Sequence, residues 1–175
     1  MKKKIDKNKG ILFWVTGLSG SGKTTISKKI KKDISKNYGP TIVVSGDDLR
    51  QIFNLKGYSY SERLILNKKF RKFAKFIINQ KINLIFAIVG MFDEARKWNR
   101  TNFENYIEIY IKSNIKNIIK NNKKKIYKKK GVGDIVGINI KPELPKKPDI
   151  TINNNFKTSM NNLSTQLLNK IKKLI

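Results

Sequence analysis

Residues 11–25 read ILFWVTGLSGSGKTT, and this stretch decides the fold. Its first six residues, 11–16, form a continuous run of mostly apolar residues, as in a buried parallel strand. A loop rich in glycine and serine follows and leads directly into a helical segment that begins near Lys23. The order of strand, glycine loop and helix predicts one unit of a parallel α/β sheet, with the loop at the carboxyl edge of that sheet.

The loop fits the Walker A pattern G-x-x-x-x-G-K-[ST] at every constrained position, directly after a strand and at the start of a helix. Its glycines let backbone N–H groups close around phosphate oxygens, and the helix N-terminus adds a positive dipole end. Lys23 is expected to contact the β- and γ-phosphates, and the Thr24 hydroxyl to ligate Mg²⁺. An ordinary Gly/Ser turn is the disfavoured alternative. The expected ATP-binding residues are Gly17, Leu18, Ser19, Gly20, Ser21, Gly22, Lys23, Thr24 and Thr25.

Strand-like and helix-like segments alternate along the rest of the chain. The pattern predicts further strands at 41–44, 83–89, 106–111 and 149–152, and helices at 23–37, 61–80, 113–121 and 158–174. This alternation predicts a three-layer α/β P-loop NTPase fold, a parallel sheet with helices on both faces, in one domain over residues 1–175. A basic tail at 1–10 and a mobile lid at 122–137 are expected, and the apolar faces of helices 61–80 and 158–174 fit either a core or a homodimer interface.

The composition excludes several classes of site and of catalytic mechanism. The chain has 175 residues with 39 Lys+Arg against 12 Asp+Glu, a formal charge of +27, and neither Cys nor His. A disulfide scaffold, a zinc-thiolate site, a cysteine nucleophile and Ser-His-Asp chemistry are therefore excluded. Three explanations of the basicity remain: drift toward Lys, Asn and Ile in a low-GC genome, an anionic substrate, and nucleic acid. No signal-peptide core or membrane helix is present, so we expect a cytoplasmic protein without a membrane partner.

A second motif follows the strand at 41–44. Residues 45–50 read SGDDLR, which puts carboxylates and an arginine at the edge of the sheet where ligands bind in open α/β folds. We expect Asp47 to orient an acceptor hydroxyl, accept its proton or hold the Mg²⁺ shell, and Asp48 to cap the following helix. Arg50 is suited to hold a phosphate or sulfate with two hydrogen bonds.

With both motifs in place, the chain resembles the adenylylsulfate kinase family from about residue 11 to residue 153. The matching segments are FWVTGLSGSGKTT, GDDLR, Gly57-Tyr58-Ser59 with Ser61-Glu62-Arg63, Ile126 to Lys129, Asp134 to Asn139, and Pro142 to Pro148. The resemblance implies transfer of the ATP γ-phosphoryl group to a ribose 3′-hydroxyl. It further implies catalytic roles for Asp47 and Lys23, a metal site at Thr24 and Asp47, and acceptor contacts from Arg50, Tyr58, Arg63, Lys68, Tyr127, Lys128 and Ile135, with residues Tyr127–Lys130 closing as a lid over the donor.

The departures from the family pattern lie where the acceptor is expected to bind. Ser45 stands for the first Asp of D-G-D, and Val89 for the Ser of I-S-P-Y. Leu66 stands for an Asn that contacts the acceptor, and the neighbouring Asn67 is turned by about 100° around the helix. Ile135 replaces the aromatic residue of D-F-T-G-I-D, which stacks on the acceptor base. Exchanging polar for apolar residues in a specificity pocket changes ligand preference by about a few kcal/mol.

Two acceptors are therefore expected. The first is adenylyl sulfate, converted to 3′-phosphoadenylyl sulfate for sulfate assimilation. The alternative is a cytidine nucleotide such as cytidine diphosphoramidate, because residues 96–102, RKWNRTN, resemble a divergent branch of the family associated with bacterial capsule clusters. Trp98 within this segment is expected to be a packing residue. The expected partners are ATP and an anionic nucleotide acceptor, without nucleic acid. Two further classes stay open as alternatives: a P-loop protein that binds nucleic acid, and a non-catalytic nucleotide sensor.

Overall fold

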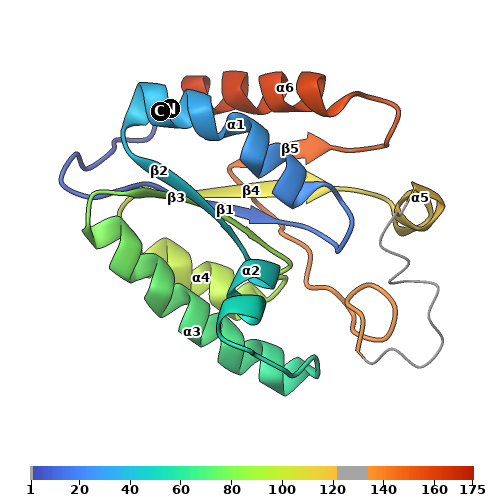
Figure 1. Ribbon diagram of the computed structural model, residues 1–175. Coiled ribbons are helices and arrows are strands. Elements are labelled where there is room, and N and C mark those ends of the chain that lie inside the picture. Colours follow the sequence, from blue (N-terminus) through green and yellow to red (C-terminus); the bar gives the residue numbers. More distant parts are fainter. Residues whose placement is uncertain (1, 122–133) are drawn as a thin grey trace.

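The computed structural model describes residues 2–121 and 134–175 (Figure 1). Within them, five parallel strands form one sheet in the order β2-β3-β1-β4-β5. The strands are β1 (Leu12–Thr16), β2 (Thr41–Ser45), β3 (Asn83–Ile88), β4 (Tyr106–Lys112) and β5 (Ile150–Asn153). Each predicted strand is confirmed, with both ends within one residue of the prediction.

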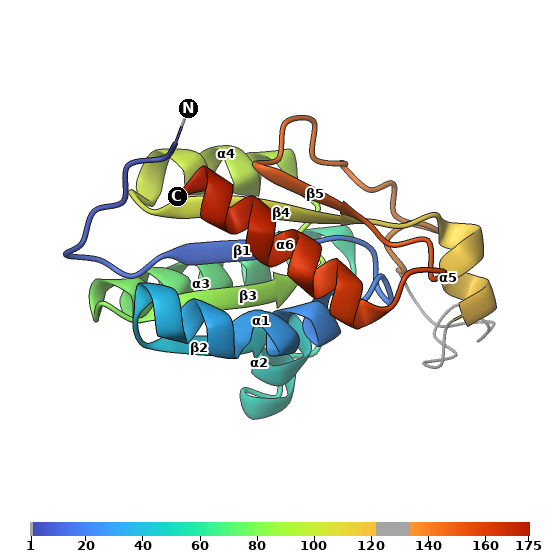
Figure 2. The same ribbon diagram turned by 90° about the horizontal axis from the view of Figure 1, so that it is seen from above.

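Helices cover both faces of this sheet (Figures 1 and 2). On one face lie α1 (Lys23–Tyr38) and α6 (Met160–Leu174), and on the other α3 (Tyr60–Asn79) and α4 (Asp93–Asn102). The short α2 (Gly46–Ile52) follows β2, and α5 (Ile115–Asn121) lies beyond the end of β4. The three-layer α/β fold is confirmed. The sequence predicted a helix after Asp48 without giving its range, which corresponds to α2, and it did not predict α4.

The core consists of two apolar layers, one on each face of the sheet. Ile26, Ile30 and Ile34 recur every four residues along α1 and pack with α6 against one face. On the other face, Phe70, Ala74 and Ile78 of α3 pack against Trp14 and Phe86 of the strands. The core thus buries the main apolar faces of α3 and α6, and the homodimer stays a prediction.

The basic segment predicted as an N-terminal tail is tied to the amino edge of the sheet. The Lys3 backbone N–H donates to the Leu174 carbonyl (2.6 Å), and its ammonium pairs with Asp149 (2.8 Å). Further along, the Asp6 backbone N–H donates to Asn105 Oδ1 (2.8 Å). Residues 2–10 therefore pack on the domain at the end opposite the Walker A loop.

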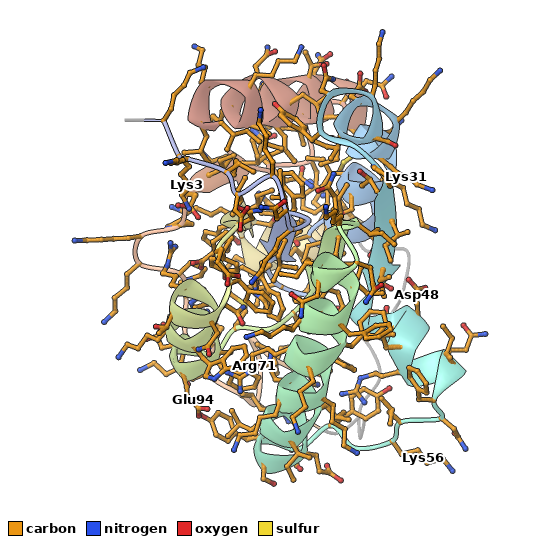
Figure 3. All side chains as sticks on the ribbon, turned by 90° about the vertical axis from the view of Figure 1, so that its left-hand side faces the viewer. Lys3, Lys31, Asp48, Lys56, Arg71 and Glu94 are labelled. Atoms are coloured by element: carbon orange, nitrogen blue, oxygen red, sulfur yellow. The ribbon has the colours of Figure 1, made fainter. Side chains whose placement is uncertain are left out.

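Lysines and arginines differ in their exposure to solvent, as two lysines and one arginine illustrate. Figure 3 shows Lys31 and Lys56 directed away from the ribbon, and both are exposed. Arg71 is only 5% exposed, lies between α3 and α4 at 3.7 Å from Glu94, and stacks over the Trp98 ring at 4.7 Å. Trp98 also meets Phe103 edge-on, which confirms it as a packing residue. No helix among the described residues is both long and apolar enough to cross a membrane.

Candidate active site

The loop between β1 and α1 has the backbone that its glycines allow. Gly20 and Gly22 have φ of 77° and 95°, values in the left-handed region that side-chain-bearing residues rarely adopt. A Cβ atom on Gly22 would also lie 2.7 Å from Met160 Cε and 3.1 Å from Asn154 Nδ2. Among the described residues no side chain caps the start of α1, and the N-terminal end of a helix favours an anion.

The predicted ATP-binding residues divide into two groups. Those that line a cavity are Ser19, Gly20, Gly22, Lys23, Thr24 and Thr25. The other group, Gly17, Leu18 and Ser21, is buried and does not line the cavity. The Lys23 ammonium is held within the loop, where it donates to the Leu18 carbonyl at 2.7 Å.

This cavity has a volume of about 1010 Å³ and lies at the carboxyl edge of the sheet. It extends from the Walker A loop past the start of α2 to the first half of α3, and residues 134–136 form part of its wall. A nucleotide pair bridged by a phosphoryl group needs a site of this extent, because pockets for drug-sized ligands already span about 300–1,000 Å³. One continuous cavity therefore joins the two sequence motifs.

At the end of β2, the two neighbouring aspartates have different surroundings. Asp48 forms a capping box with Ser45: its backbone N–H donates to Ser45 Oγ (3.1 Å), and its carboxylate accepts from the Ser45 N–H (2.7 Å). The prediction that Asp48 caps the helix is confirmed, although Ser45 is the N-cap residue itself. Asp47 is not a member of this capping box, and it lines the cavity together with residues of the Walker A loop and of α2.

Two arginines and a tyrosine form the next part of the wall. Arg50 Nη1 donates to the carbonyls of Leu55 (3.2 Å) and Gly57 (2.8 Å). Arg63 donates to the carbonyls of Tyr58 (2.6 Å) and Asp134 (2.8 Å), and so ties α3 to the far wall. Both guanidinium groups lie over the Tyr58 ring, at 4.4 and 5.4 Å from its centroid.

Electrostatics favour an anion at this wall. Burial lowers the pKa of Arg63, and the neighbouring positive charge of Arg50 lowers it further. An anionic group placed between the two guanidinium groups would relieve that repulsion. The structure thus brings the predicted acceptor residues Arg50, Tyr58 and Arg63 together in the cavity, each with exposed surface.

All three apolar replacements in the acceptor half also line the cavity: Leu66, Val89 and Ile135. The Val89 carbonyl accepts a hydrogen bond from Thr16 Oγ1 (2.7 Å), so the backbone there is fixed independently of the side chain at position 89. The expectation that Asn67 is turned away from the acceptor needs correction. Asn67 lines the cavity beside Leu66, because the cavity-facing stripe of α3 is wider than the 100° between adjacent residues.

Three predicted acceptor residues are not part of the described cavity. Lys68 is exposed on α3 and does not line it, because it lies a further 100° around the helix from Asn67. Tyr127 and Lys128, and with them residues 122–133 of the predicted lid, lie outside the described residues. The remaining lid residue in the prediction, Ile135, is present in the wall.

The segment after β5 contributes to the site, and no sequence motif predicted this. Asn154 is 2% exposed and its Nδ2 donates to the Ser21 carbonyl (2.9 Å), which holds the Walker A loop from the opposite side. Phe156 and Met160 follow and line the cavity together with Thr25. The family resemblance ends at residue 153, and the polar run at 153–155 resembles an ordinary loop, so no motif marked these residues.

The comparisons with known proteins agree on one family. A family model described as adenylylsulphate kinase matches residues 9–153. Cytidine diphosphoramidate kinase from Campylobacter jejuni is 36% identical over 171 residues, which cover 96% of this chain and 98% of that protein. An adenylyl-sulfate kinase from Clostridium acetobutylicum is 33% identical, with 86% of this chain and 78% of the relative covered.

A solved structure shows the same fold. The APS kinase of Mycobacterium tuberculosis, in complex with AMPPNP and APS, superposes with a TM-score of 0.80 at 22% identity, covering 94% of this chain and 98% of the other. The intact Walker A loop, the cavity that both sequence motifs line, and the family match over most of the chain lead to one conclusion. The chain belongs to the adenylylsulfate kinase family and is an ATP-dependent phosphotransferase.

Proposed function

We propose that this kinase transfers the γ-phosphoryl group of ATP to the ribose 3′-hydroxyl of a cytidine nucleotide of the cytidine diphosphoramidate type. The observation that carries the proposal is the contrast within one cavity. Its donor half keeps every constrained residue of the Walker A pattern, whereas Leu66, Val89 and Ile135 replace polar or aromatic residues in the acceptor half. Such a site retains the chemistry and changes the substrate.

The donor half positions the nucleoside triphosphate. Backbone N–H groups at the start of α1 and the Lys23 ammonium neutralise the charge of the β- and γ-phosphates, as in other P-loop enzymes. The Thr24 hydroxyl and the Asp47 carboxylate, which line the same cavity, fit Mg²⁺, because this ion takes one or two protein oxygens in addition to phosphates and water. When bound, Mg²⁺ supplies further neutralisation of the phosphate charge.

The acceptor half positions the hydroxyl. Arg50 and Arg63 attract the anionic groups of the acceptor nucleotide, and Asp47 orients its 3′-hydroxyl and accepts the proton. The hydroxyl oxygen forms a bond to the γ-phosphorus, the bond from that phosphorus to the β,γ-bridging oxygen breaks, and ADP leaves. Phe156 and Met160, next to Thr25, give the donor side an apolar wall on which the adenine of ATP packs.

The choice of cytidine rests on two supports. The Campylobacter jejuni relative matches over nearly the full length of both chains at 36% identity. In addition, the three replacements remove groups that the family pattern uses for adenylyl sulfate. The capsule-modification role follows this acceptor.

Adenylyl sulfate remains the second candidate, with a role in sulfate assimilation, because a specific observation favours it. Arg50, Tyr58 and Arg63 occupy the positions that the family motifs give them, and they lie together in the cavity. Adenylyl sulfate was the first expectation from the sequence. The Campylobacter jejuni relative supports the cytidine acceptor, which we therefore propose first.

An acceptor panel tests the proposal. Purified protein with ATP and Mg²⁺ is given cytidine diphosphoramidate, CDP or adenylyl sulfate in turn, and ADP release and the 3′-phosphorylated product are measured. We expect kcat/KM to be highest for cytidine diphosphoramidate. Faster turnover of adenylyl sulfate overturns the choice of base. Tight ATP binding without transfer to any nucleotide indicates a sensor, and salt-dependent binding of DNA or RNA below micromolar concentration indicates a nucleic-acid protein.

A further inference from the structure

Asn67 is a buried polar residue whose side-chain oxygen has no partner among the described residues. Its side chain is 3% exposed, it lines the cavity, and its Oδ1 has no hydrogen-bond partner among the described residues. It belongs to the stripe of α3 formed by Arg63, Leu66, Asn67 and Phe70, all of which line the cavity. Buried amide groups in proteins are nearly always hydrogen-bonded, so this one requires an explanation.

The surroundings of Asn67 exclude the ordinary explanation, a fixed structural contact. The other two cavity residues that flank it on α3, Leu66 and Phe70, are apolar and buried. Asn83 shows what a structural asparagine does in this fold: its Nδ2 donates to the Tyr38 carbonyl at 3.0 Å, and its Oδ1 accepts from the Ile11 backbone N–H at 2.8 Å. In the part of the chain that the structure describes, Asn67 Oδ1 has no comparable contact.

The charged residues of the acceptor wall are engaged elsewhere. Arg50 and Arg63 hold the loop carbonyls of residues 55–58 and lie over Tyr58, which suits them to the phosphate end of an acceptor. Val89 and Ile135 complete the wall and offer no side-chain donor or acceptor. A carboxamide in an otherwise apolar part of the cavity is suited to fix the orientation of a flat heterocycle, because only one edge of the ring satisfies it.

We propose that Asn67 is the residue that hydrogen-bonds the base of the acceptor nucleotide. Its carboxamide pairs with an edge that presents an N–H donor beside a ring nitrogen or carbonyl acceptor, such as the amino group and N3 of cytosine. Leu66, which occupies the position of the family's acceptor-binding Asn, packs against the ring. The polar contact has therefore moved by one residue along α3. This inference rests on the proposed function, since it deepens the assignment of the same site.

The test combines a protein change with a ligand change. Asn67→Leu is expected to raise KM for the cytidine acceptor about tenfold or more and to leave KM for ATP within twofold of the original value, because a pocket that loses a substrate hydrogen bond loses affinity for that substrate alone. The acceptor analogue with pyrimidin-2-one, which lacks the amino group, is expected to bind the original protein about tenfold more weakly than cytidine. Asn67→Leu is expected to bind both equally.

Thermal unfolding separates a structural role from a binding role. If the Asn67 amide stabilised the fold, Asn67→Leu would lower Tm and leave acceptor KM unchanged, whereas a binding role predicts a higher acceptor KM without a loss of Tm. Asn99→Leu is the matched control, since Asn99 is also fully buried with an unpartnered Oδ1 but lies on α4 and does not line the cavity. Its acceptor KM is expected to stay within twofold. Should Asn67→Leu fold poorly, Asn67→Ser removes the amide without adding bulk.

An acceptor KM within twofold of the original in both Asn67 variants overturns the inference, as does an equal loss for cytidine and its analogue. If the unmodified protein phosphorylates no nucleotide, the proposed function fails, and the inference is then judged on dissociation constants for CDP measured by calorimetry with AMPPNP present. Equal constants for the original protein and Asn67→Leu, or no binding by either, overturn it. A tenfold weaker constant for the variant supports it.

Discussion

The donor and acceptor halves of the cavity are built in different ways. The donor half is a backbone structure: glycines at left-handed φ, helix N–H groups and carbonyls that hold Lys23 and Asn154. The acceptor half is a side-chain structure on α2, α3 and the ends of the strands. A loop shaped by its backbone tolerates few sequence changes, whereas a wall of side chains can be exchanged on the same scaffold. This difference explains why one motif is intact and the other is rewritten.

The largest effect on activity is expected from a substitution in the donor half. Lys23→Ala should lower kcat/KM by about 10³-fold with any acceptor, because the γ-phosphoryl charge loses its nearest cation in the transition state. Steady-state ADP release measures this. Lys31→Ala is the control, since Lys31 lies exposed on the same helix (Figure 3) and its loss should change little. A variant at Lys23 that retains a tenth of the activity would contradict the assignment.

The next effect lies at the junction of the two halves. Asp47→Asn should reduce kcat by about 10²- to 10³-fold while ATP binding is spared, because a proton acceptor is lost and the shape is kept. Single-turnover kinetics and ATP titration separate the two quantities. Asp48→Asn is the comparison: it weakens the capping box, so about 0.5–2 kcal/mol of stability should be lost with a much smaller change in kcat. A large loss of kcat in Asp48→Asn together with a mere loss of stability in Asp47→Asn would mean that the two aspartates have the opposite roles.

Substituting the family's residues into the acceptor wall tests whether this wall determines the choice of acceptor. The triple change Leu66→Asn, Val89→Ser and Ile135→Phe should shift the ratio of kcat/KM for adenylyl sulfate over the cytidine acceptor by about ten- to a hundredfold. KM for ATP should stay the same, because the donor half is untouched. Competition between the two acceptors in one reaction reports the ratio directly. No shift would mean that specificity resides elsewhere in the chain.

A smaller effect is expected where the segment after β5 supports the Walker A loop. Asn154→Ala removes the hydrogen bond to the Ser21 carbonyl and leaves that buried group unsatisfied, at a cost of about 1–3 kcal/mol. KM for ATP should rise several-fold and acceptor KM should not. Asn155→Ala changes the neighbouring exposed asparagine and serves as the control. Equal effects on both substrates would show general destabilisation instead.

The smallest effect concerns the start of α3. Hydrogen bonds from the Ser59 hydroxyl and backbone to Glu62 lower the pKa of that carboxyl. Because the folded pKa lies below the unfolded one, the stabilisation is present above the unfolded value near 4.5 and is lost as pH falls further. The Tm difference between Glu62→Gln and the original protein should therefore shrink in acid. The same comparison is then made in Ser59→Ala protein. If the Tm difference caused by Glu62→Gln still depends on pH there, the Ser59 hydroxyl is not the cause of the lowered pKa.

The sequence predicted the strands well because each is a short apolar run between turns, and it predicted the Walker A loop because glycine, lysine and threonine are tied to backbone geometry. It gave no range for α2 and missed α4 for a different reason. α2 has only seven residues, too few for a periodicity, and α4, DEARKWNRTN, is polar and held by charge. Arg96 and Arg100 of α4 pair with the buried Glu108 of β4 at 3.5 and 2.6 Å, and such pairing has no sequence period.

The site was predicted in part for related reasons. Asp47, Arg50, Tyr58 and Arg63 lie within contiguous motifs, so their grouping followed from the order of the segments. Asn67 and Asn154 become relevant only in three dimensions. Asn67 lines the cavity and its buried Oδ1 has no partner within residues 2–121 and 134–175, and Asn154 reaches a loop 133 residues away in the chain. Single-sequence patterns carry no such information.

The Lys3 N–H donates to the Leu174 carbonyl, so the two ends of the described chain lie side by side at the amino edge, away from the cavity (Figure 1). A short flexible linker would join them without disturbing the phosphate loop. A circularly permuted enzyme opened elsewhere on the surface should then retain its activity. For the same reason, the chain is suited to insertion as a domain into a host protein. Its kinase activity would then report whether the host keeps the two termini of the inserted chain close together.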